Sequence, residues 1–205
     1  MSAEASGGEA SEAARLAGSV SENGASELRD DPSAAASRLL PPGPASPAAS
    51  HAPFPLTLRA ATEADLDAIW AIESAVFGAE AWSRDLMRDE LTADLRCYLV
   101  LVNEAGAIVG YGGLLAVGTE GDIQTIALSP DARGAGQGRR LMNALLDAAD
   151  ERGVNEVFLE VRADNPVART LYASLGFEEI GVRPRYYQPE GVDAVVNKLQ
   201  MENRR

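Results

Sequence analysis

A glycine-rich loop between a predicted strand and a predicted helix constrains the fold of this chain more than any other feature. The loop consists of Arg133, Gly134, Ala135, Gly136, Gln137 and Gly138. Amides at the start of a helix and the helix dipole favour anions, and glycine lets a phosphate come close to the backbone. Each amide donated to a charged oxygen contributes about 1.5–3 kcal/mol, so a few of them could hold a pyrophosphate. The loop therefore predicts a phosphate site, with a flexible turn as the alternative.

Two other kinds of phosphate-binding loop do not match these residues. A P-loop ends in Gly-Lys-Ser or Gly-Lys-Thr, whereas Gly138 is followed by Arg139 and Arg140. In a dinucleotide-binding fold, the strand after the glycine loop ends in an acidic residue, and Glu160 is in the matching position. The loop of such a fold also needs a third glycine, and this chain has Arg139 there. Only 45 residues follow Glu160, too few for the remaining units of a doubly wound sheet.

Hydrophobic periodicity and turn residues predict a mixed α/β domain. Strands are predicted at about residues 56–59, 96–102, 107–117, 122–128, 156–161, 178–182 and 194–201. Helices are predicted at about 62–77, 83–91, 138–152 and 166–175. Pro166 suits the first turn of the last helix, because that position needs no amide donor.

Composition divides the chain into a tail at residues 1–52 and a domain at residues 53–205. The tail is rich in Ala, Ser, Gly and Pro and has no aromatic residue. We expect it to be disordered, because it cannot bury enough apolar surface to offset the entropy of ordering. We find no signal-peptide pattern and no stretch of membrane-spanning length. With a single cysteine, Cys97, these features predict a cytoplasmic protein with no membrane association.

The charge balance argues against direct binding of nucleic acid. The chain has 18 Lys and Arg residues against 31 Asp and Glu, a net charge of -13, and nucleic-acid binding relies on clustered cations. The one histidine, His51, lies in the predicted tail. Proton transfer in the domain must then use carboxylates, tyrosines or water, and no histidine-based metal site is expected.

Several motifs around the loop resemble the GNAT acyltransferases, and more narrowly their RimI type. The acetyl-CoA motif of the family resembles Arg133-x-x-Gly136-x-Gly138 together with the preceding Ile126-Ala127-Leu128-Ser129-Pro130. The RimI type resembles the runs 159–165 and 171–177, followed by 181–183 and by Tyr186-Tyr187. Enzymes of this type acetylate the N-terminal alanine of a small-subunit ribosomal protein. The resemblance covers nearly all of residues 56–201.

The resemblance implies a GNAT fold, a mixed, mostly antiparallel twisted sheet of about seven strands flanked by about four helices. It also implies acetyl-CoA as co-substrate, the N-terminus of a protein as acceptor, and no metal. The residues that it assigns to acetyl-CoA are Ile126, Ala127, Leu128, Arg133, Gly134, Ala135, Gly136, Gln137, Gly138, Arg139 and Asn165. Arg140 is a further candidate for the cofactor phosphates, and Asn165 could equally cap the helix that starts at Pro166.

Two residues carry the chemistry that the resemblance implies. An α-amino group has a pKa of about 8 and is mostly charged at neutral pH, so a general base helps it to attack a thioester. Glu160 is the candidate base, with an ion pair to an arginine such as Arg162 as the alternative. Tyr172 is the candidate acid that protonates the leaving thiolate, with core packing as the alternative. Tyr186 and Tyr187 either shape the acceptor channel or pack at the end of a strand.

The sequence leaves the acceptor open, because a fold does not determine its substrate. A small-molecule amine or a lysine side chain would suit the same chemistry. A non-catalytic module that binds acyl-CoA is a third possibility, which the presence of both Glu160 and Tyr172 disfavours.

Overall fold

The computed structural model describes residues 38–39 and 56–204 of the chain. Most of the tail predicted at residues 1–52 lies outside these residues, so its disorder stays a prediction. Within the described residues, no helix is long and apolar enough to cross a membrane.

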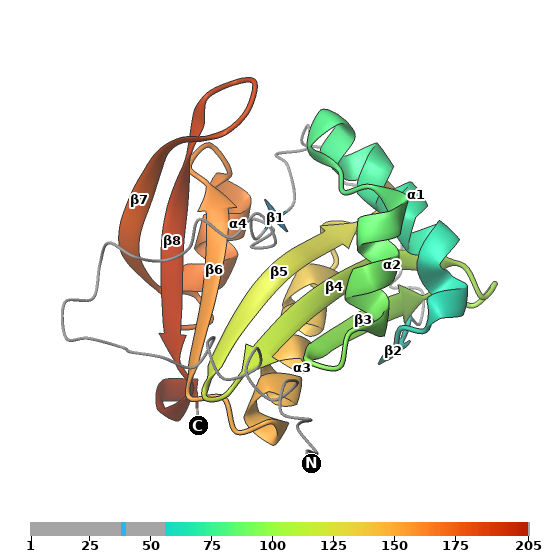
Figure 1. The fold of residues 1–205 in the computed structure, drawn as a ribbon, viewed down its shortest axis with the longest axis horizontal. Helices are drawn as coiled ribbons and strands as arrows, with labels where there is room; N and C mark the ends of the chain where they lie inside the picture. The colour runs from blue at the N-terminus through green and yellow to red at the C-terminus, as the bar shows by residue number, and fades with distance from the viewer. Residues whose placement is uncertain (1–37, 40–55, 205) are drawn as a thin grey trace, which may run out of the picture. The chain divides into compact units, whose positions relative to one another are not determined.

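Seven strands form one twisted sheet in the order β2-β3-β4-β5-β6-β8-β7 (Figure 1). Their bounds are β2 Thr57–Ala60, β3 Arg96–Val102, β4 Ile108–Val117, β5 Glu120–Leu128, β6 Glu156–Arg162, β7 Glu178–Tyr187 and β8 Val192–Gln200. Neighbouring strands are antiparallel except β5 and β6, which are parallel. The predicted mixed and mostly antiparallel sheet is confirmed.

Four α-helices cover the two faces of this sheet. They are α1 Leu66–Phe77, α2 Arg84–Thr92, α3 Gln137–Glu151 and α4 Pro166–Ala173. In Figure 1, α1 and α2 lie in front of the sheet and α3 and α4 behind it. The buried side chains form two clusters, one on each face of the sheet. In one cluster Met87 of α2 packs with Tyr111, and in the other Leu145 of α3 and Tyr172 of α4 pack with Ile126. Both faces are thus buried, which explains the nearly continuous apolar runs of the central strands.

Local signals in the sequence set the starts of these helices. Ser83 caps α2, because its Oγ accepts a hydrogen bond from Leu86 N at 3.1 Å. Upstream of α1, Asp65 Oδ2 accepts from Thr62 N at 2.8 Å and closes a capping box. A short 3-10 helix, η2 (Gly78–Glu80), connects α1 to the segment before α2.

The parallel strands β5 and β6 separate after a short stretch of pairing. Glu120 to Asp122 pair with Glu156 to Phe158, and beyond them the two strands continue without pairing to each other. A bulge in β5 accompanies this separation: Gly113 of β4 pairs with Thr125 and Leu114 pairs with Ile123, so Gln124 has no partner in the ladder. Bulges bend a strand and increase its twist, and the result is an opening in the sheet between β5 and β6.

A two-residue strand lies at this opening. β1 (Arg38–Leu39) pairs in parallel with Thr125 and Ile126 of β5, and it also lies beside β6. The sequence patterns that predict the other strands give no sign of it.

Candidate active site

The glycine loop has the geometry of an anion site. Gly134 and Gly136 have positive φ angles of 81° and 75°, a conformation that other residues rarely adopt, and Gly136 is the N-cap of α3. Among the described residues, no backbone carbonyl accepts from the amides of Gly134, Ala135 or Gly136. The first amides of α3, from Gln137 on, have no acceptor within the helix. A row of free donors therefore lies at the positive end of a 15-residue helix.

The arginines around this loop take different positions. Gly136, Arg139 and Arg140 line one end of a hollow of about 470 Å³ that extends along α3 as far as Asp147. Arg139 donates to Ser174 Oγ at 2.6 Å and Arg140 to Leu56 O at 2.7 Å, so both side chains are held beside the hollow. Arg133 instead turns back and donates through Nε to Leu128 O at 3.1 Å, which ties the loop to the end of β5. Burial lowers the pKa of Arg133.

Glu160 lies on β6 with its side chain only 12% exposed. It alternates with Leu159 and Val161, which pack with the α3 and α4 cluster, so it points to the opposite face of the sheet. Its Oε1 is 3.0 Å from Arg183 Nε of β7, and its Oε2 is buried with no hydrogen-bond partner among the described residues. Burial raises the pKa of Glu160, against the opposing effects of Arg183 and Tyr186.

The arginine that pairs with Glu160 is thus Arg183. Arg162, which the sequence suggested as an alternative partner, is directed elsewhere, to Glu80, Asp164 and Glu190. An ion pair with an arginine, the alternative to a catalytic base, is therefore present at Glu160, and its role as a base stays a prediction. Arg183 is 41% exposed, so solvent screens this pair.

Tyr172 lies on α4 and is 1% exposed. Its ring packs edge to face with Phe177 at a centroid distance of 5.9 Å. Its hydroxyl is buried and has no hydrogen-bond partner among the described residues, although buried hydroxyls normally find one. Burial raises the pKa of Tyr172 above its ordinary value, with a smaller contribution from Tyr187. The phenol therefore carries its proton at neutral pH.

Tyr186 and Tyr187 connect these two residues. Their rings meet edge to face at 5.3 Å. Burial raises the pKa of both Glu160 and Tyr186, and in addition Tyr186 lowers the pKa of Glu160 while Glu160 raises that of Tyr186. Burial raises the pKa of Tyr187, and the charge of Glu160 raises it further. Tyr187 also raises the pKa of Tyr172, so it has Glu160 and Tyr172 as neighbours. β7 includes both tyrosines, although it was predicted to end before them, and their role in an acceptor channel stays a prediction.

The candidate base and the candidate acid lie on opposite faces of one sheet. Glu160 points towards the side of α1 and α2, whereas Tyr172 belongs to the cluster under α3 and α4. A paired sheet would separate the two side chains. The sheet is open between β5 and β6 beyond Asp122 and Phe158, so at that place no strand pairing separates its two faces.

The edge of β5 at this opening contains the residues that were assigned to the cofactor arm. Ile126, Ala127 and Leu128 pair with β4 on one side, and their other side faces the opening, where β1 pairs with Thr125 and Ile126. Gln124, at the bulge, has a buried Oε1 with no hydrogen-bond partner in the described part of the chain. Gln137 Oε1, at the start of α3, is also buried and has no hydrogen-bond partner among the described residues. Buried polar atoms of this kind fit a polar ligand that passes through the opening.

Asn165 serves as the N-cap of α4. Its Oδ1 accepts from Ala168 N at 3.1 Å, and the residue is 1% exposed. The capping role proposed as an alternative is therefore present, and contact with the cofactor stays a prediction.

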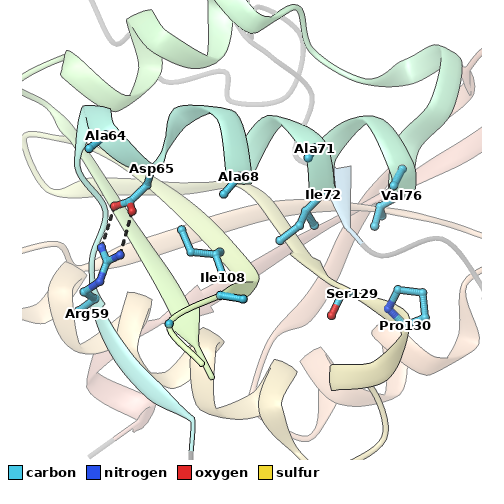
Figure 2. Close-up of a pocket in the computed structure, with 13 residues that line it drawn as sticks. Arg59, Ala64, Asp65, Ala68, Ala71, Ile72, Val76, Ile108, Ser129 and Pro130 are labelled. Atoms are coloured by element: carbon cyan, nitrogen blue, oxygen red, sulfur yellow. Dashed lines mark hydrogen bonds and ion pairs between the residues drawn. The ribbon is translucent and has the colours of Figure 1, made fainter. Parts of the chain in front are cut away.

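A second hollow, of about 510 Å³, lies beside the end of β5 and contacts neither Glu160 nor Tyr172, and Figure 2 shows its lining. Alanines of α1 form one wall, with Ile108, Ser129 and Pro130 opposite. The charged groups there are Arg59 and Asp65, which already bond to each other at 2.7 and 2.8 Å. The guanidinium of Arg59 holds the pKa of Asp65 at about 2. With its ionic groups paired, this hollow offers no chemistry comparable to the opening between β5 and β6.

Sequence reasoning missed three features of the site. Gln124 and Thr125 interrupt the apolar run from Ile123 to Leu128, which was a detectable sign of the bulge. Arg183 was noted only as part of a family motif, and its pairing with Glu160 depends on a shift in register between β7 and β8. The contact of Arg162 with Glu80 joins residues that are far apart in the chain, so no local pattern could predict it. Among the described residues, no three His, Cys, Asp or Glu side chains are grouped to hold a metal ion.

Comparisons with known proteins find relatives in sequence and in fold. The sequence profile of the Acetyltransferase (GNAT) family matches residues 66–177. Over 145 residues, 68% of the chain, the sequence is 39% identical to the N-alpha-acetyltransferase RimI of Mycobacterium tuberculosis, of which the match covers 89%. A match of 40% identity to an uncharacterized protein of Mycobacterium leprae covers 72% of the chain but only 42% of that protein.

A solved structure is also similar to the described fold. The crystal structure of the ribosomal-protein-S18-alanine N-acetyltransferase from Escherichia coli has a TM-score of 0.66 and 31% identity, with 71% of this chain and 94% of that chain covered.

Proposed function

This chain belongs to the acetyltransferase (GNAT) family, and from that premise we propose that it acetylates the N-terminal α-amino group of a protein. The acceptor that fits best is the N-terminal alanine of a small-subunit ribosomal protein. Two relatives support this choice by their names, the RimI N-alpha-acetyltransferase and the ribosomal-protein-S18-alanine N-acetyltransferase.

One observation supports the proposal above all others. Two buried groups that can exchange protons, Glu160 Oε2 and Tyr172 Oη, have no hydrogen-bond partners in the described part of the chain and lie on opposite faces of a sheet that is open between β5 and β6. An amine that enters from one face and a thioester that enters from the other can react only where both have access. The glycine loop at the end of β5 holds the phosphates of the thioester donor in this arrangement.

Acetyl-CoA, when bound, supplies the acetyl group as a thioester. Free amides of the loop from Gly134 to Gly138 bind its diphosphate, with Arg139 and Arg140 beside them. Glu160 accepts the proton of the acceptor ammonium, directly or through one water, and its raised pKa brings it closer to the pH at which it works. Tyr172 donates its phenolic proton to the departing sulfur. Arg183 and Tyr186 both favour the charged form of Glu160 and so oppose the effect of burial on its pKa.

Mass spectrometry with matched peptides tests this function. The full chain and acetyl-CoA are incubated with a peptide that begins with a free alanine and lacks lysine, with the same peptide N-formylated and carrying one internal lysine, and with a polyamine. We expect acetylation of the free α-amino group alone, and a parallel assay of ribosomal proteins should find the modified N-terminus. Acetylation of only lysine or the polyamine would overturn the acceptor. No release of CoA thiol with any amine would overturn catalysis itself.

A further inference from the structure

Arg162 joins three segments of the chain around Glu160. It lies on β6 two residues after Glu160 and on the same face of the strand, with its side chain 15% exposed. Its Nη1 is 3.3 Å from Glu80 Oε1 of η2 and 3.7 Å from Glu190 Oε2, in the turn between β7 and β8. Its Nε is 3.1 Å from Asp164 Oδ1. One guanidinium thus contacts carboxylates from η2, from the end of β6 and from the turn that follows β7.

The same guanidinium also lies over the ring of Tyr187, at 5.3 Å from its centroid. Tyr187 is 5% exposed, and its pKa is raised first by burial and then by the charges of Glu160, Tyr186 and Glu80. Glu80 and Arg162 therefore lie in the immediate surroundings of the candidate base. In Figure 1 the end of β6 and the β7–β8 turn lie at the same end of the sheet.

This arrangement depends on properties that only arginine has. A planar guanidinium can bond carboxylates along two edges and stack on an aromatic ring at the same time, whereas a lysine ammonium is a point charge. The three carboxylates would repel one another without it. Asp164 raises the pKa of Arg162 most strongly, so the guanidinium keeps its charge at any working pH.

We propose that Arg162 is a positioning residue that ties η2 and the β7–β8 turn together as the two walls of the acceptor channel. The proposal rests on the proposed function for the location of the acceptor beside Glu160. The donor is bound at the glycine loop, which Arg162 does not contact, so Arg162 governs the affinity for the acceptor and leaves the affinity for acetyl-CoA unchanged.

Steady-state kinetics of full-length variants test the proposal. Arg162→Met should raise KM for the alanine peptide by about 10-fold or more, because misplaced walls orient the amine poorly. Arg162→Lys, which keeps the charge, should give an intermediate KM, and KM for acetyl-CoA should stay within about 2-fold in both. The control is Arg169→Met, which removes an arginine paired with Glu179 at 2.7 Å outside the site. It should leave both KM values unchanged.

A double-mutant cycle identifies the contact that matters. Glu80→Gln should also raise KM for the peptide, and the double variant with Arg162→Met should be no worse than Arg162→Met alone, because the two residues act through one contact. Additive effects of the two substitutions would show that Glu80 and Arg162 act separately, and would overturn the role of this pair.

Hydrogen exchange gives a readout that does not depend on activity. In Arg162→Met, amides of residues 78–83 and 188–192 should exchange faster than in the wild type, while those of α3 should not change. Unchanged exchange in both segments, or a fall in kcat with KM for the acceptor unaltered, would overturn the proposal. If the wild type acetylates another amine instead of the peptide, the same comparison made with that amine still tests Arg162, so the two proposals fail separately.

Discussion

At the scale of the residue, the protonation of Glu160 is central to the proposed chemistry. Its raised pKa means that the ionised side chain is less favourable in the folded protein than in water. The stability that the protonated form provides is present at low pH and is lost as pH rises through the folded-state pKa. A side chain that lowers stability at neutral pH is expected where function requires it.

Glu160→Gln should therefore lower activity without lowering stability. Loss of a general base costs typically about 100-fold or more near pH 7, and the loss should shrink above about pH 8, where the acceptor amine is already neutral. The midpoint of thermal unfolding at pH 7 should be equal to or above that of the wild type. The measurements are a pH–rate profile, an unfolding curve and calorimetry with acetyl-CoA, whose affinity should not change.

Glu156→Gln is the matched control, because Glu156 lies on the same strand and face but pairs with Lys198 at 2.7 Å outside the site. A Glu160→Gln variant with the pH–rate profile of the wild type would show that water alone removes the proton.

Residues with local signals were predictable, and residues that depend on distant contacts were not. Gly136, Ser83 and Asn165 have the positions that capping and turn preferences indicate. The pairing of Glu160 with Arg183 required the register between β7 and β8, which contains two irregularities. No pattern within either strand encodes that register.

At the scale of the element, the start of α3 is the feature with the sharpest test. Gly136→Asp should weaken the binding of acetyl-CoA by at least about 100-fold, because a carboxylate a few ångströms from a phosphate opposes binding by about 4 kcal/mol at an effective dielectric of about 20. Isothermal titration calorimetry measures this directly.

Gly153→Asp is the control for backbone strain. Gly153 has the same φ of 75° and equally open surroundings, but it follows the other end of α3. It should lose stability to a similar or larger extent and keep its affinity for acetyl-CoA. Equal affinities of both variants would remove the glycine loop from the binding site.

The helices and most strands were predicted to within a few residues, since their apolar periodicity is strong. β3 was predicted at residues 96–102, as found, and the helix predicted at 138–152 is α3 at Gln137–Glu151. The opening between β5 and β6 was not predictable, because it results from a bulge and from the end of pairing between two strands that are separated by a helix. Pairing of this kind is a property of the sheet and not of either segment.

At the scale of the whole molecule, the proposed mechanism has acetyl-CoA and the acceptor amine reach Glu160 and Tyr172 from opposite faces of the sheet. Residues of both hydrophobic clusters hold the strands, so the two approaches remain fixed relative to each other. In this mechanism acetyl-CoA and the acceptor amine bind from different sides, so neither blocks the entry of the other.

β1 adds a test at the same scale. Arg38→Pro combined with Leu39→Pro removes two backbone donors and should release β1 from Thr125 and Ile126, so that acetyl-CoA binds more tightly. The pair Arg38→Ala with Leu39→Ala keeps the amides and should bind like the wild type. Calorimetry compares the three proteins, and equal affinities would show that β1 does not interfere with the cofactor arm.

The position of β1 has a thermodynamic consequence. If acetyl-CoA binds at the edge of β5 as the sequence predicts, β1 would compete with it for Thr125 and Ile126 from within the same chain, and the apparent affinity for acetyl-CoA would fall in proportion to the fraction of molecules in which that edge is free. Cleavage, modification or capture of the upstream segment would then shift the level of acetyl-CoA at which the enzyme is half saturated. The concentration of acetyl-CoA at half saturation would then depend on how often β1 covers the edge of β5.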